Sequence, residues 1–120
     1  MKVAELSGAA LDWAVAICEE LISINTEHLF KPWYLLENYT PSTDWAQAGP
    51  IIEREMISIE WTGEDWMAYI WHDEEFFAPG PLVAAMRCYV AHKLGDEVEV
   101  PTQIDPAREL ANQVFGFKGA

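Results

Sequence analysis

The chain has 120 residues, 51% of them hydrophobic, with six Trp, four Tyr and five Phe. This length predicts one domain over residues 1–120, and this apolar content excludes an intrinsically disordered protein. With 20 acidic and 7 basic residues the net charge is −13, which disfavours direct binding to nucleic acids or anionic membranes. The sequence shows neither an apolar run that could span a bilayer nor a signal-peptide pattern, so we expect a cytoplasmic protein.

The first third of the chain predicts one helix and one long loop. An apolar stripe at helical spacing predicts a helix over residues 8–22, with Ser7 placed to cap it. Residues 24–50 show no period, and their Pro and Gly residues predict a loop. Many aromatic side chains in this loop indicate that it is held against the body of the protein. Ordered loops of this length are often functional, and the alternative is a lid over one end of the core.

A β-hairpin is predicted next. Residues 51–61 favour a strand, residues 62–65 a turn, and residues 66–71 a returning strand that is apolar on both sides. Either both faces of the hairpin are covered, or one face binds a partner. Because an isolated hairpin is marginally stable, we expect a third strand, supplied by residues 96–100 or by a second copy in a homodimer.

The last third of the chain predicts two further helices. One begins at Pro81 and ends before Gly95, and a short one starts at Asp105. Between them, residues 96–100 alternate acidic residues with Val, as a short edge strand does. The sequence therefore predicts an α+β fold in which two main helices and a short C-terminal helix pack on a small, mainly antiparallel sheet built around a β-hairpin.

Motifs for catalysis or metal binding are missing from the sequence. Cys18 and Cys88 fall on apolar helix faces, which predicts buried free thiols. Ser42 lies outside any nucleophile-elbow motif, so we expect Ser42 and Asp44 to organise the loop by bonding backbone amides. His72 and the acids after it lack the spacing of a metal site. We expect neither an enzyme nor a metal or cofactor.

A binding site is the stronger expectation from these residue types. Eight residues offer aromatic faces, hydrogen-bonding groups and two guanidinium groups: Tyr39, Ser42, Asp44, Trp45, Arg54, Trp61, Trp66 and Arg87. Arginine beside aromatic rings suits a phosphate or a nucleotide. The alternative is structural, since each arginine can pair with acidic neighbours and aromatic side chains more often fill cores.

The acidic residues leave two interpretations open. They form a solubilising surface, or they mimic DNA phosphates and occupy the site of a DNA-binding host protein. Because the acids occur in short groups and not in one regular ladder, the solubilising surface is favoured.

Two segments of the chain have distinctive motifs: residues 39–55, with Pro-Ser-Thr-Asp-Trp, and residues 84–101, with Met-Arg-Cys-Tyr-Val-Ala. Together with residues 5–16, they resemble the NinX-like family of small bacteriophage and prophage proteins. The family pattern carries Gly at the positions of Ala48 and Met56, and at Met56 this chain is expected to favour a strand over a turn. The resemblance implies a phage accessory protein and implies no activity, cofactor or catalytic residue.

The leading hypothesis from the sequence is a non-enzymatic module that binds a host or phage macromolecule, in particular a protein. The acidic surface and the aromatic loop motivate it. The alternative is a protein that binds or sequesters a small nucleotide-like ligand between the 39–45 segment and the Trp-bearing hairpin.

Overall fold

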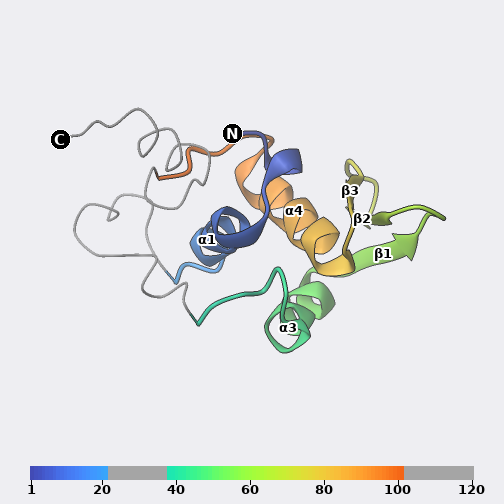
Figure 1. Ribbon diagram of the computed structural model, residues 1–120, viewed down its shortest axis with the longest axis horizontal. Helices are drawn as coiled ribbons and strands as arrows, with labels where there is room; N and C mark the ends of the chain where they lie inside the picture. The colour runs from blue at the N-terminus through green and yellow to red at the C-terminus, as the bar shows by residue number, and fades with distance from the viewer. Residues whose placement is uncertain (22–37, 102–120) are drawn as a thin grey trace, which may run out of the picture.

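The computed structural model describes residues 1–21 and 38–101, and these form the predicted α+β fold (Figure 1). In chain order the elements are the 3-10 helix η1 (Val3–Glu5), α1 (Gly8–Cys18), α3 (Trp45–Glu55), β1 (Ile57–Trp61), β2 (Trp66–Ile70), β3 (Phe76–Ala78) and α4 (Pro81–Leu94). The helix expected from Asp105, and residues 24–37 of the expected loop, lie outside the described residues.

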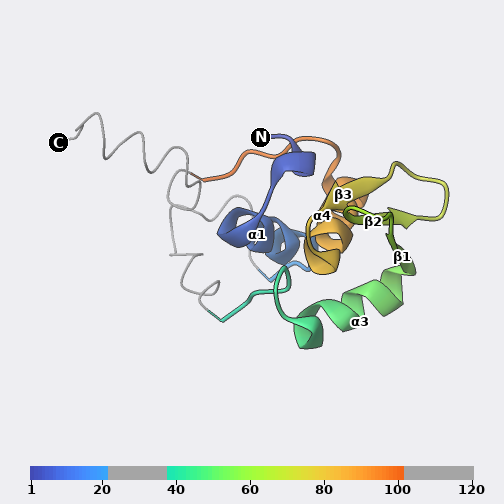
Figure 2. The same ribbon diagram turned by 45° about the vertical axis from the view of Figure 1, so that its right-hand side comes forward.

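Helix α4 is the centre of the fold, with α1 packed on one side and the sheet on the other (Figures 1 and 2). It begins at Pro81, whose missing N–H is not needed in a first turn, and Gly95 closes it with a φ of 94°. Both ends are as predicted. Its buried side chains are Leu82, Ala84, Ala85, Met86, Cys88, Tyr89 and Val90. They surround most of the helix, as expected for one that is packed on two sides.

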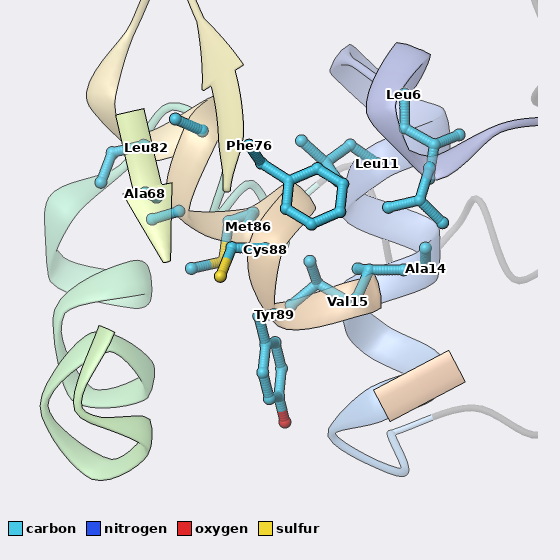
Figure 3. Packing of buried hydrophobic residues seen from close by; sticks show 14 of the residues in the cluster. Leu6, Leu11, Ala14, Val15, Ala68, Phe76, Leu82, Met86, Cys88 and Tyr89 are labelled. Carbon is cyan, nitrogen blue, oxygen red and sulfur yellow. The ribbon is translucent and has the colours of Figure 1, made fainter. Parts of the chain in front are cut away.

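The hydrophobic core is one cluster to which α1, α3, α4 and the sheet all contribute. Figure 3 shows Leu11 and Val15 of α1 on one side of α4 and Ala68 of β2 on the other. Burying one such aliphatic side chain stabilises a fold by about 1.5–3 kcal/mol. The largest fully buried side chains include Trp13 and Tyr89, so aromatic residues fill much of the interior.

The sheet has the strand order β1-β2-β3, and both strand pairs are antiparallel. β1 and β2 form the predicted hairpin, with Ile57 opposite Ile70 and Trp61 opposite Trp66. Alternate side chains of a strand point to opposite faces, and the face toward α4 is apolar. Its buried members are Ile57, Ala68, Ile70, Phe76 and Ala78.

The third strand is β3, so the prediction that residues 96–100 supply it is wrong. β3 pairs with β2, with Phe77 opposite Met67. Its sequence signal is only three residues long and follows the acidic residues 73–75, which made the region look like a solvated turn. β2 ends at Ile70, because Trp71 adopts a left-handed backbone conformation with a φ of 55°.

Residues 96–100 pair with the N-terminal segment instead. The amide of Val3 donates to the carbonyl oxygen of Asp96 at 2.8 Å, and the amide of Val98 donates to that of Met1 at 3.0 Å. The predicted alternation is confirmed in burial, since Val98 and Val100 are buried while Glu97 and Glu99 are exposed.

Helix α3 covers residues for which the sequence predicted a loop up to Pro50 and a strand from Ile51, so both predictions are wrong over this helix. Asp44 caps α3 by accepting a hydrogen bond from the amide of Ala46, and Pro50 lies inside the helix. A proline inside a helix removes a backbone hydrogen bond, which is why Gly49-Pro50 suggested a break. Burial of Ala48 and Ile51, three residues apart on one face, holds the helix against the core.

The chain reverses at Met56, where the sequence was expected to favour a strand. Met56 closes α3 in a left-handed conformation, with φ 55° and ψ 50°. This conformation suits glycine and is strained for other residues. Only the later part of the expected 51–61 strand, Ile57–Trp61, is a strand.

Helix α1 begins at Gly8 as predicted but ends at Cys18 and not at residue 22, because Glu20 is left-handed with a φ of 61°. Ser7 takes the capping position without a side-chain hydrogen bond to the helix. Cys18 and Cys88 are free thiols, as predicted. Among the helices of the described residues, none has the length and apolar character needed to cross a membrane.

Candidate functional site

The Pro-Ser-Thr-Asp-Trp segment is the entrance to α3, and Asp44 is its cap. One carboxylate oxygen accepts from the amide of Ala46 and the other from the Gln47 side chain, both at 2.9 Å. The Gln47 amide oxygen in turn accepts from the amide of Thr40 at 2.7 Å. Asp44 therefore organises its own segment, as the sequence predicted for this residue. The neighbouring Trp45 is displayed to solvent, with 57% of its surface exposed.

Ser42 holds the same segment to α1. Its amide donates to Oδ1 of Asp12 at 2.9 Å, and Ser42 is only 4% exposed. Burial raises the pKa of Asp12, while the Ser42 amide acts in the opposite direction. The Ser42 hydroxyl is also close enough to lower that pKa, but it makes no hydrogen bond with good geometry to any described residue. Tyr39, half-buried beside this contact, packs against the core.

Arg54 joins three helices. Its guanidinium donates to Glu19 at the end of α1, with Nη2 to Oε2 at 2.5 Å, and to Glu55 at 2.8 Å. It also donates to the hydroxyl of Tyr89 on α4 at 3.0 Å, and its carbon lies 5.8 Å from the centre of that ring. The Tyr89 hydroxyl itself donates to Glu19. The structural alternative for Arg54, pairing with acids, is thus what the structure shows, although on a helix and not on a strand.

Ionisation of Glu19 is coupled to its hydrogen bonds with Arg54 and Tyr89. Burial opposes ionisation of Glu19, but hydrogen bonds from Arg54 and Tyr89 outweigh it and lower the Glu19 pKa. Burial and the bond to Glu19 raise the pKa of Tyr89. Sequence reasoning missed Glu19 and Tyr89, because each lies 35 residues from Arg54 along the chain and only the fold brings them together.

Arg87 links the N-terminal segment to the sheet. Its Nε donates to the carbonyl oxygen of Leu6 and its Nη1 to that of Phe77, both at 2.7 Å. Burial lowers the pKa of Arg87. A side chain that bonds two backbone carbonyls in this way has a structural role, which any ligand of the guanidinium would disturb.

Trp61 and Trp66 form an aromatic pair at the tip of the hairpin. They are cross-strand partners with ring centres 5.3 Å apart and planes at 57°. Such tilted pairs stabilise by about 0.5–1.5 kcal/mol beyond the area they bury. Trp61 remains 56% exposed, whereas Trp66 is half-buried against the core.

The eight candidate residues lie in separate places. The 38–44 segment enters α3 at its N-terminus, whereas the hairpin leaves from its C-terminus (Figure 2). The eleven-residue helix between them is about 16 Å long. Trp45 and Trp61 therefore do not share a pocket with the two arginines, and the binding role of the set stays a prediction.

Within the described residues, a hollow with a volume of about 220 Å³ lies between α4 and the turn that precedes β3. It is lined by Asp73, Glu74, Phe76, Cys88, Ala91, His92 and Asp96. His92 Nδ1 lies 3.0 Å from a carboxylate oxygen of Asp73. Burial raises the pKa of the Cys88 thiol to about 12, with a contribution from Asp73. At neutral pH Cys88 is therefore a protonated thiol, which is a poor nucleophile.

The described residues contain no group of His, Cys, Asp and Glu side chains arranged to hold a metal ion. Comparison with known proteins identifies one family. The family model described as "Bacteriophage P22, NinX" matches residues 2–93. No curated protein matches the chain.

Proposed function

The chain thus belongs to the family described as "Bacteriophage P22, NinX", and we propose that it is a non-enzymatic accessory protein that binds a protein of the phage or of its host. The observation that carries the proposal is the display of large apolar side chains on an acidic protein. The most exposed are Met56, Trp71, Trp45, Trp61 and Leu21, and Phe77 follows. Aromatic residues and Met are enriched in protein interfaces relative to the remaining surface.

The net charge of −13 favours a protein partner over a nucleic acid. A phosphate backbone is repelled by such a surface, whereas a basic protein is attracted and its association is accelerated. Because the proposed partner is a protein of the phage or of its host, the site of action in this proposal is the cytoplasm of the bacterial host.

The states of the candidate nucleophiles support a binding role over catalysis. Burial raises the pKa of Cys18 and of Cys88 to about 12, so neither thiol is ionised at neutral pH. Ser42 is buried, and it lies beside a carboxylate that its amide already bonds. A serine nucleophile requires a hydroxyl that a substrate can reach and a base that activates it.

The test is affinity capture with the full-length chain immobilised in nuclease-treated lysate of phage-infected bacteria. The matched control is an unrelated acidic protein of equal net charge on the same resin. The proposal expects a protein that the chain retains and the control does not, and that binds the chain saturably once purified. Capture that equals the control in infected and uninfected lysates overturns it.

The small-ligand alternative stays a prediction with its own measurement. A ligand that uses both arginines must displace Glu19 and Glu55 from Arg54, and the carbonyl oxygens from Arg87. Native mass spectrometry of protein purified from infected cells decides between the two. A mass increase of metabolite size favours the ligand, and the mass of the polypeptide alone favours the interaction module.

A further inference from the structure

The sheet has a second face, opposite to the one that packs on α4. Its side chains are those of Ser58, Glu60, Met67, Tyr69 and Phe77, which alternate with the buried residues of the three strands. We call this set the open face. None of its members is buried, and Phe77 is 45% exposed.

An apolar strip runs across the open face between two carboxylates. Phe77 lies opposite Met67, and Met67 lies opposite Glu60. The Tyr69 hydroxyl donates to Glu60 at 2.7 Å. That bond is the main cause of a raised Tyr69 pKa, and the negative charge of Glu75 adds to it. Glu60 on β1 and Glu75 ahead of β3 thus flank the strip from its two sides.

Trp71 directly follows Ile70, the last residue of β2. It is 80% exposed and has a φ of 55°. A left-handed backbone is strained for a bulky residue, and strain of this kind concentrates at functional sites. The indole meets the His72 ring edge-on at 5.1 Å and leaves most of its surface open to a partner.

The charge of this region has one sign. Residues 56–80, which contain the whole sheet and its turns, include no Lys or Arg. They include six acids: Glu60, Glu64, Asp65, Asp73, Glu74 and Glu75. The arginines just outside this range, Arg54 and Arg87, are held by Glu19, Glu55 and two backbone carbonyls. Their guanidinium groups are therefore not directed at the acids of the open face.

We infer that the open face docks a basic amphipathic segment of a partner protein. Apolar side chains of the segment cover Met67, Tyr69 and Phe77, and its Lys or Arg side chains pair with Glu60 and Glu75. A further cation stacks on the exposed indole of Trp71, an arrangement that is favourable for Trp above other rings. This inference rests on the proposed function and names the surface and the partner class for it.

The first experiment uses a fluorescein-labelled peptide in which Lys and Leu alternate, titrated with the full chain and followed by anisotropy. Two peptides of equal length serve as comparisons, one with Ser in place of Leu and one with Glu in place of Lys. The inference expects binding of the Lys-Leu peptide and much weaker binding of both others. Equal binding of the Lys-Leu and Lys-Ser peptides overturns it, because charge alone would then suffice.

The variants locate the site. Glu60→Gln with Glu75→Gln is expected to weaken binding about fivefold, as is Trp71→Gly, which also relieves the strained backbone. The matched controls are Glu53→Gln with Glu99→Gln, which removes two exposed acids elsewhere, and Trp45→Ala, which removes an exposed Trp at the far end of α3. Equal weakening by the test and control variants overturns the inference.

The same variants separate this inference from the proposed function. If a captured partner binds the open-face variants as tightly as the wild type, the open face is wrong and the interaction module stands. If nothing is captured, the proposed function fails. The peptide titrations then decide whether the open face binds a basic amphipathic segment.

Discussion

Met56 closes α3 in a left-handed conformation, and replacing it with glycine is expected to raise the stability of the protein. A left-handed backbone costs a residue with a Cβ about 1–2 kcal/mol, and glycine escapes this strain. Glycine also gives the unfolded chain more freedom, which offsets about 0.5–1 kcal/mol. Because the Met56 side chain is 80% exposed, its removal sacrifices little burial. The net gain is therefore about 0.5–1 kcal/mol.

The measurement is thermal unfolding of Met56→Gly followed by circular dichroism. For a chain of this length about 1 kcal/mol corresponds to roughly 4 °C, so Tm is expected to rise by about 2–4 °C. The control is Met56→Ala, which removes the same exposed side chain and keeps the strain. A glycine variant no more stable than the alanine variant refutes the reasoning, because the left-handed conformation would then carry no strain.

Four further predictions concern polar contacts between segments that lie far apart in the sequence. Asp12→Ala leaves the amide of Ser42 without its acceptor and is expected to destabilise by about 1–3 kcal/mol in urea unfolding. Asp12→Asn keeps an acceptor oxygen. Since the folded pKa of Asp12 is raised, the contribution of Asp12 to stability falls as pH rises from the usual 3.8 through the folded pKa, and the stability difference between wild type and Asp12→Asn is expected to change over that range. The folded pKa of Glu19 is lowered, so its contribution to stability is complete above the usual pKa of 4.5 and disappears as pH falls through the folded pKa. The stability difference between wild type and Glu19→Gln is therefore expected to shrink in acid. A difference that stays constant with pH would contradict the pairing of Glu19 with Arg54 and Tyr89. Arg87→Ala removes both bonds to backbone carbonyls and is expected to cost about 2–3 kcal/mol in thermal unfolding, with Arg87→Lys restoring only part because Lys lacks the forked geometry.

The elements with strong periodic signals were predictable from the sequence. Helix α4 combines a long apolar stripe with Pro at its first position and Gly after its last. The hairpin was predictable from the alternation of Ile57, Ile59 and Trp61 with Ser58 and Glu60 and from the turn at residues 62–65, although the returning strand is apolar on both sides. In these cases the local pattern and the tertiary packing favour the same structure, so the sequence alone is sufficient.

Helix α3 was missed although a start signal was present. Asp44 followed three residues later by Gln47 is close to a capping box, and the two side chains do bond each other. Gly49-Pro50 outweighed it, because breakers are strong local signals while the burial of Ala48 and Ile51 depends on α4 being in place.

The locations and contacts of the candidate residues were not predictable from the sequence. The bond from a backbone amide to Asp44 agrees with the sequence reasoning, although Asp44 caps a helix that this reasoning missed. The partners of Arg54 and Arg87 could not be found, because they come from distant segments or are backbone carbonyls. Every residue has a backbone carbonyl oxygen, so no sequence pattern shows which carbonyl will accept a hydrogen bond from an arginine.

The central position of α4 has a consequence for synthesis on the ribosome. When the chain has emerged as far as Gly80, α1, α3 and all three strands have been made, but the helix that they pack against has not. Their apolar faces stay accessible to water and to chaperones until the 14 residues of α4 have been made. A nascent chain stalled at that point is a good substrate for proteases. Once α4 has been made, the same segments can pack against it and are protected from proteolysis.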